Sequence, residues 1–178
     1  MPTVGYRKQR FARRRETGGS MADRDVIEAL IATYRELNQR FRPVLAATNA
    51  DVGSVDDPTT PLGILYRLRN RELNASQAIK EMLRRGERTI FDDEGEPLLT
   101  VQQAVSGLTA TVLLSQFGTA REATLAMVRD LPDEVWQEEF ETPRGRMTLR
   151  AYLETLVARD REAIRALEER LGQLASRS

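Results

Sequence analysis

The chain has 178 residues, 40% hydrophobic and 30% charged, and its 27 basic residues balance its 27 acidic ones. It contains no cysteine and no histidine, which excludes disulfides, thiolate nucleophiles, Cys-ligated zinc, Ser-His-Asp triads and every histidine-ligated metal. The length fits one domain with a buried core, no apolar run is long enough for a membrane span, and no secretory signal is evident, so we expect a cytoplasmic protein.

Residues 1–20 are predicted to be a basic, disordered arm ahead of a single domain over residues 21–178. The arm holds six basic residues and one acid, whereas the rest of the chain holds 21 basic and 26 acidic residues. With Tyr6 and Phe11 among its arginines, the arm suits a polyanion such as nucleic acid. The alternative is that it is not translated, because Met21 reads as a natural start that follows Gly-Gly-Ser. Nucleic-acid binding therefore depends on whether the arm is real.

Two long amphipathic helices are predicted in the first half of the domain. The first covers residues 23–47, and Pro43 should kink or fray its last turn. A loop rich in Asp, Gly, Pro and Thr (48–61) leads to the second helix over residues 60–85, which ends at Gly86. The apolar stripe of this second helix consists of Leu65, Leu68, Glu72, Ala75, Ile79 and Met82.

Two more helices complete the predicted fold. A long loop (85–98) precedes a helix over residues 100–131 with Thr100 as its N-cap, and a loop with one short turn (132–147) precedes a helix that begins after Thr148. The stripe of the third helix consists of Leu114, Phe117, Arg121, Leu125 and Val128, and that of the fourth of Leu153, Leu156, Val157, Asp160, Ile164, Leu167, Leu171 and Leu174. The pattern predicts an all-α four-helix bundle in which at least one loop crosses over the bundle.

One charged residue interrupts each of the last three stripes: Glu72, Arg121 and Asp160. A buried charge costs several kcal/mol unless it is paired and hydrogen-bonded. One arginine can fork to two carboxylates, so we predict an interhelical Glu72–Arg121–Asp160 cluster, capped by the Tyr34 hydroxyl. Two interpretations stay open: the cluster fixes the register of the helices, or it forms the polar floor of a ligand pocket.

Several short motifs, taken together in their order and spacing, resemble those of a known family. They are Leu-Tyr-Arg-Leu-Arg-Asn-Arg-Glu (65–72), Phe-x3-Arg-x3-Leu (117–125), Leu-Pro-Asp-Glu-x-Trp (131–136) and the run over residues 156–167. Over residues 23–174 the chain resembles the DinB/YfiT-like bundle proteins. The resemblance implies a four-helix bundle whose middle helices run parallel, with the 85–98 loop as the crossover between helices two and three.

The resemblance also implies a particular site. Many members of that family bind a divalent metal through three histidines, one on the second helix and two on the fourth. The matching positions here are Arg67, Arg159 and Ala163, so the frame of the metal site is present and its ligands are replaced. Two replacements are cationic and would repel a divalent ion. We therefore expect no metal and no cofactor, and the thiol transfer known for some members is in doubt here.

Two functions follow as expectations. The first is a metal-free binding or interaction bundle, with Arg67, Arg159 and Ala163 forming a pocket for a small anion; the competing interpretation is that both arginines extend to solvent. The alternative is a divalent-metal-dependent transferase that uses oxygen ligands alone, from Glu72 and Asp160. No pair of a nucleophile and a base stands out. The sequence therefore favours a non-catalytic protein over an enzyme without deciding between them. A homodimer is a further expectation, and no membrane partner is expected.

Overall fold

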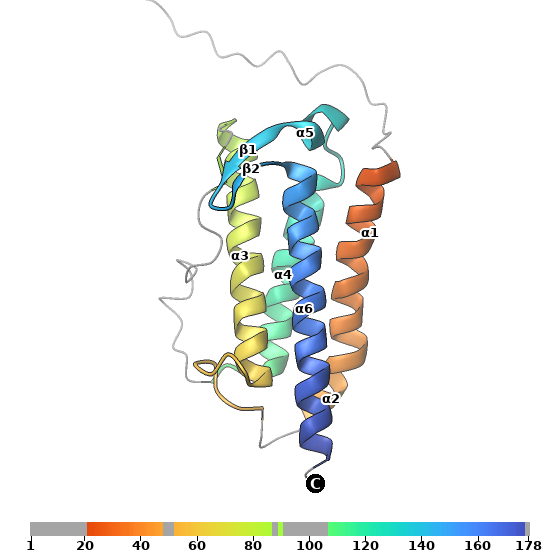
Figure 1. Cartoon of the computed structure of the whole chain (residues 1–178), viewed down its shortest axis with the longest axis vertical. Helices are drawn as coiled ribbons and strands as arrows, with labels where there is room; N and C mark the ends of the chain where they lie inside the picture. Colours follow the sequence, from red (N-terminus) through yellow and green to blue (C-terminus); the bar gives the residue numbers. More distant parts are fainter. Residues whose placement is uncertain (1–20, 48–51, 87–88, 91–106, 177–178) are drawn as a thin grey trace, which may run out of the picture.

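The computed structural model describes residues 21–47, 52–86, 89–90 and 107–176, and these residues are mostly helical. Within them, four long helices lie side by side (Figure 1). They are α1 (Met21–Glu36), α3 (Pro61–Arg85), α4 (Ala110–Val128) and α6 (Leu149–Ala175). The all-α prediction is confirmed at this level. Among the described residues no helix combines the length and the apolarity that a membrane crossing requires.

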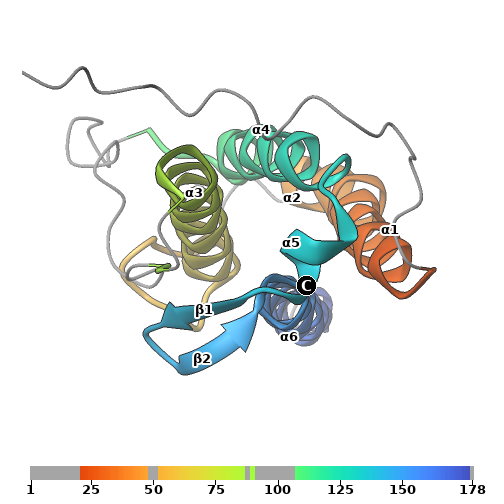
Figure 2. The same cartoon turned by 90° about the horizontal axis from the view of Figure 1, so that it is seen from above.

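The direction of each helix decides which residues share one level of the molecule. Helices α3 and α4 run in the same direction, whereas α1 and α6 run the opposite way (Figure 1). Seen along the helices, α3, α4, α1 and α6 surround a common centre (Figure 2). Helix α3 contacts both α4 and α6, and α1 contacts α6 and α4. The centre is therefore lined by one face of each helix.

The first helical segment continues to Ala47 but changes its winding on the way. A π-helical stretch, η1 (Leu37–Phe41), joins α1 to α2 (Arg42–Ala47), and the Arg42 amide donates to the Leu37 carbonyl. A π turn leaves the hydrogen-bond ladder out of step with the following α-helix. Pro43, which has no amide to donate, follows at once. The predicted disturbance at Pro43 therefore takes the form of a widened turn before it.

The prediction for α3 is confirmed at both ends. The Thr60 hydroxyl accepts from the Gly63 amide at 3.2 Å, and Gly86 closes the helix with φ +67°.

The predicted start of the third helix at Thr100 is wrong for α4, which begins after Thr109. The Thr109 hydroxyl accepts from the Val112 amide at 3.2 Å, and Gly107 has φ +101°, which a right-handed helix cannot contain.

A small β-hairpin, absent from the prediction, covers one end of the helices. After the short helix α5 (Asp133–Gln137), strand β1 (Glu139–Thr142) pairs antiparallel with β2 (Gly145–Thr148). The predicted short turn is thus α5, but residues 139–148 are not a simple loop. The hairpin buries Phe140, and the buried Ile90 donates its amide to the Glu141 carbonyl at 2.8 Å, which ties residues 89–90 to β1. Phe91, Thr100 and the arm over residues 1–20 lie outside the described residues.

Candidate functional site

A layer of polar side chains crosses the middle of the helix assembly. It consists of Thr33 on α1, Glu72 on α3, Arg121 and Thr124 on α4, and Asp160 on α6. We call these five residues the polar layer. Each of the five is at most 5% exposed. The sequence prediction that Glu72, Arg121 and Asp160 meet between the helices is therefore what the structure shows.

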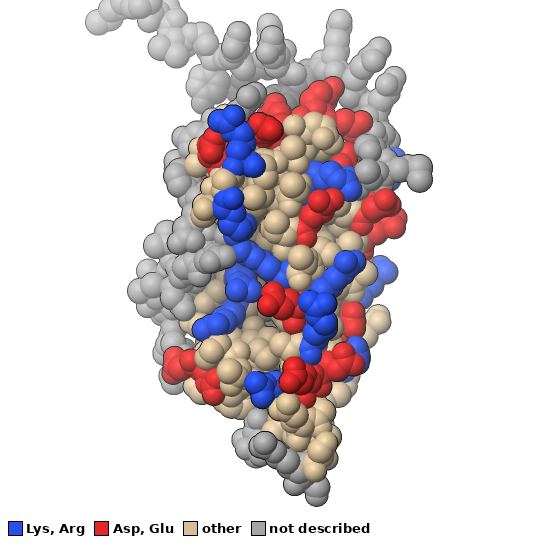
Figure 3. Space-filling model, viewed as in Figure 1, with Lys and Arg blue, Asp and Glu red and all other residues tan. Residues whose placement is uncertain are grey.

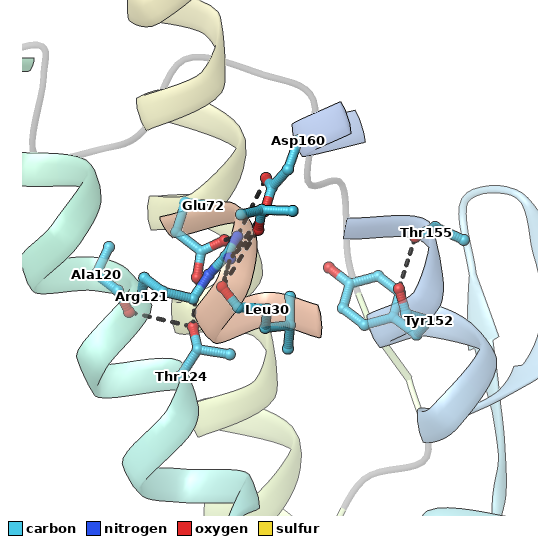
Figure 4. A network of polar contacts seen from close by, with 9 residues as sticks. Leu30, Glu72, Ala120, Arg121, Thr124, Tyr152, Thr155 and Asp160 are labelled. Atoms are coloured by element: carbon cyan, nitrogen blue, oxygen red, sulfur yellow. Dashed lines mark hydrogen bonds and ion pairs between the residues drawn. The ribbon is translucent and has the colours of Figure 1, made fainter. Parts of the chain in front are cut away.

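Arg121 lies at the centre of the polar layer and contacts both acids (Figure 4). One terminal nitrogen, Nη2, donates to Glu72 Oε2 at 2.8 Å and to Asp160 Oδ1 at 3.2 Å. The other, Nη1, donates to Asp160 Oδ2 at 2.8 Å and to the Leu30 carbonyl at 3.0 Å. The guanidinium carbon also lies 4.9 Å from the centroid of the Phe117 ring. The fork of the guanidinium thus binds three other helices at once.

Two threonines supply the remaining donors to the carboxylates. The Thr33 hydroxyl donates to Asp160 Oδ2 at 2.5 Å, and the Thr124 hydroxyl donates to Glu72 Oε1 at 2.8 Å. Every carboxylate oxygen of the layer therefore accepts at least one hydrogen bond. This satisfaction is what allows two acids to be buried together, since an unpaired buried charge would be strongly destabilising.

The electrostatics of the layer balance burial against pairing. Burial by itself would lower the pKa of Arg121, but Glu72 and Asp160 outweigh it and raise that pKa above its usual value, so the guanidinium stays charged. Burial raises the pKa of Asp160, and Arg121 opposes the rise. With both acids ionised the layer carries one net negative charge. Its stability therefore depends on the cation at its centre.

The polar layer divides the apolar core into two clusters. On every long helix the residues on one side of the layer belong to one cluster and those on the other side to the second. On α6, for example, Val157 belongs to the first cluster and Ile164 to the second, and Asp160 stands between them. A shift of any helix along its axis would bring apolar groups against these charges. The layer therefore fixes the register of the helices.

The prediction that Tyr34 caps the cluster is wrong. Thr33, its neighbour in the chain, holds that place, and no hydrogen bond joins the Tyr34 hydroxyl to the layer within the described residues. Tyr34 instead packs against the Phe117 ring, with centroids 6.2 Å apart, and against Gly118. A Cβ added at Gly118 would lie 2.7 Å from the Tyr34 hydroxyl oxygen, so only glycine leaves room for the ring.

The three positions that the family resemblance would assign to metal ligands lie on α3 and α6, outside the polar layer. Helices α3 and α6 run in opposite directions, so Arg67 and Ala163 are displaced the same way from Glu72 and Asp160, by roughly 7.5 Å and 4.5 Å at 1.5 Å per residue. Arg67 is exposed, whereas Arg159 and Ala163 are half-buried. We call these three residues the outer site.

The surface over α3 and α6 is rich in basic side chains (Figure 3). The first eleven residues of α3 contain Arg67, Arg69 and Arg71 and no acid. Within the part of the chain that the structure describes, no carboxylate lies within ion-pair distance of Arg67 or Arg71. Arg69, which is buried, stacks on the Tyr66 ring at 4.8 Å. Arg71 belongs to this surface although the sequence analysis did not single it out.

A shallow cavity of about 250 Å³ lies elsewhere, between α1 and α6. Its lining residues are Asp25, Val26, Ala29, Arg150, Glu154, Val157, Ala158 and Arg161. None of them belongs to the polar layer or to the outer site. Beside it, the buried Asp23 accepts from Arg150 at 3.1 Å, an ion pair that the sequence pattern did not indicate.

The described residues contain no group of three His, Cys, Asp or Glu side chains placed to hold a metal ion. The oxygens of Glu72 and Asp160 could in principle serve a hard cation, but Arg121 already uses three of the four. Thr33 and Thr124 were missed as partners because a threonine within an apolar stripe carries no signal of its own.

In comparisons with protein-family models, characterised proteins and solved structures, nothing matches this chain.

Proposed function

We propose that this chain is a metal-free binding module with a four-helix bundle of the DinB/YfiT-like type. The parallel course of α3 and α4, with a long connection between them, supports this type of bundle. So does the position of Asp160 beside the replaced ligand positions on α6. The ligand we propose is a small anion held at the outer site.

The observation that carries the metal-free proposal is the position of the Arg121 guanidinium between Glu72 and Asp160. A divalent ion bound to these acids would have to displace a fully buried cation from five acceptor contacts. Arg67 and Arg159 add positive charge to α3 and α6 outside the layer. Both effects oppose a metal, and for this reason a metal-dependent transferase is not our proposal.

The anion proposal depends on the arginines that face outward. Arg67 is exposed and Arg71 follows it by one helical turn, so both side chains extend from the same side of α3. Neither is neutralised by an acid among the described residues. An arginine pair in this setting suits a carboxylate or a phosphate, which accepts two parallel hydrogen bonds from each guanidinium.

The test has two parts, both on tag-free protein. Elemental mass spectrometry after growth with added divalent metals should find less than about a tenth of an equivalent of metal, because charge repulsion opposes binding. Thermal melting with inorganic phosphate and citrate should show a saturable stabilisation. The double variants R67Q/R71Q and R67Q/R159Q should each lose that stabilisation.

The matched control is R40Q. Arg40 is exposed on the first helical segment and pairs with Glu36 and Glu168, so its replacement removes surface charge away from the outer site. Anion stabilisation that survives in R67Q/R159Q, or that falls equally in R40Q, would contradict the proposed site. Near-stoichiometric metal that is lost in E72Q or D160N would instead establish an oxygen-ligand metal centre.

A further inference from the structure

We infer that the polar layer is a guanidinium-binding site that the chain fills with its own side chain, and that it accepts a free alkylguanidinium ion when Arg121 is cut back to alanine. The inference concerns the interior of the molecule and does not depend on the proposed function of the outer site. It assigns the two buried acids a ligand class, which is a planar organic cation.

The acceptors of the site are held by helices other than the one that carries Arg121. The Leu30 carbonyl and Thr33 come from α1, Glu72 from α3 and Asp160 from α6. Their own packing positions them, because each is flanked by residues of the two apolar clusters. Shortening the Arg121 side chain therefore removes the ligand without removing any of these acceptors.

The geometry favours a guanidinium over a metal ion. The carboxylate oxygens lie 2.8 Å and 3.2 Å from two different nitrogens, so they converge on the edges of a plane about two ångströms wide and not on one point. A hard cation such as Ca²⁺ or Mg²⁺ needs its oxygens at roughly 2.0–2.6 Å from a single centre. The Phe117 ring, 4.9 Å from the guanidinium carbon, adds a face on which a flat cation can stack.

The charge of the site also selects for a cation. Without Arg121, two buried carboxylates face each other with hydroxyl donors from Thr33 and Thr124 alone. A neutral ligand of the same shape would leave both negative charges uncompensated. An anion would add to them. The ligand must therefore be positively charged as well as planar.

The experiment uses R121A and ethylguanidinium, which restores the guanidinium and the two methylene groups that the substitution removes. Melting temperature is measured from 0 to 20 mM ligand, a range in which denaturation by guanidinium compounds is negligible because it occurs at molar concentrations. At ten times the dissociation constant we expect a saturable rise of about 3–6 °C. Urea, which is planar but neutral, should give no saturable rise.

Two control proteins separate binding at the site from a general salt effect. R40A removes an exposed arginine that pairs with Glu36 and Glu168, so it creates no buried cavity and should not respond. R121A/D160N loses one of the two acids and should bind ethylguanidinium at least tenfold more weakly. A rise of equal size with sodium chloride, or an equal response in R40A, would overturn the inference.

R121A is expected to be less stable than the original chain, because it leaves two buried acids without a cation. If it is unfolded without ligand, far-UV circular dichroism should show helix returning as ethylguanidinium is added. E72Q/R121A, which leaves a single buried acid and less repulsion, provides a second folded background in which one equivalent should still bind by calorimetry. No binding in either variant, or tighter binding of Ca²⁺ than of ethylguanidinium, would overturn the inference.

Discussion

Arg121 and Arg67 lie on the two contacting helices α4 and α3, and their surroundings differ in almost every respect. Arg121 is fully buried and contacts two acids, a hydroxyl and a backbone carbonyl. Arg67 is exposed on α3 and has no acid within ion-pair distance among the described residues. The same side chain thus stabilises the fold at one position and remains available for a ligand at the other.

The difference follows from solvent access. A buried guanidinium finds its hydrogen-bond partners inside the protein. Its removal therefore leaves the partner carboxylates buried without a compensating positive charge. An exposed guanidinium is solvated by water, and its removal changes little but the surface charge. Substitutions of the buried and of the exposed arginine should therefore separate effects on stability from effects on ligand binding.

The largest effect is expected for R121M, which keeps an apolar stem but removes the charge. Glu72 and Asp160 would then be buried without a cation, so we expect a loss of about 3–5 kcal/mol in the free energy of unfolding at pH 7. Urea denaturation followed through the buried Trp136 measures it.

The control for R121M is the triple variant E72Q/R121M/D160N, which has no buried charge in the layer. It should recover more than half of the lost stability, because the main cost in R121M is the unpaired acids. An R121M variant as stable as the original chain would show that the buried ion pairs contribute nothing to folding.

A smaller effect is expected for T33V, which replaces the hydroxyl with a methyl group of similar size. Asp160 Oδ2 loses a donor at 2.5 Å, and we expect a destabilisation of about 1–3 kcal/mol. The comparison is T119V, because the Thr119 hydroxyl donates to the Ser115 carbonyl on an exposed face. Equal melting temperatures for the two variants would mean that the Thr33 hydroxyl is not a significant partner of the acid.

The pH dependence of R121M should report the protonation of Asp160 directly. Burial raises the pKa of Asp160 above 3.8 even with Arg121 present, and without Arg121 the rise should be larger. A raised folded-state pKa stabilises the native state at low pH, and this stabilisation is lost as pH rises through that pKa. R121M should therefore gain on the original chain as pH falls through the raised pKa of Asp160, by at most about 1.4 kcal/mol for each pH unit. R121M/D160N should show a flatter profile, and a profile as steep as that of R121M would exclude Asp160 as the titrating group.

Much of the fold was predictable because the apolar stripes have a clear helical period. The stripe of α3 from Leu65 to Met82 is buried as expected, and Gly86 ends the helix as its place after the stripe indicated. The start of α4 was not, because Thr100 and Thr109 are equally good caps and only the backbone at Gly107 decides between them. The hairpin was missed because each strand has four residues and Phe140 alone is buried.

The polar layer was predictable for a different reason. A charge inside an apolar stripe must be paired, and one arginine with two acids on neighbouring helices admits few solutions. What the sequence could not decide was the rotation of the first helix. Thr33 and Tyr34 differ by 100° around its axis, so a small rotation exchanges which hydroxyl reaches Asp160. The tertiary packing of Tyr34 against Gly118 settles that choice.

The smallest effect on stability is expected for R67Q. Because Arg67 is exposed and unpaired among the described residues, the free energy of unfolding should stay within about 0.5 kcal/mol of the original value. The same variant should nevertheless weaken the phosphate-induced rise in melting temperature, since one of the proposed anion contacts is gone. K80Q is the matched control, because Lys80 is an exposed cation on the same helix more than three turns away. A large loss of stability in R67Q would place Arg67 in a structural role, and an unchanged phosphate response would remove it from the outer site.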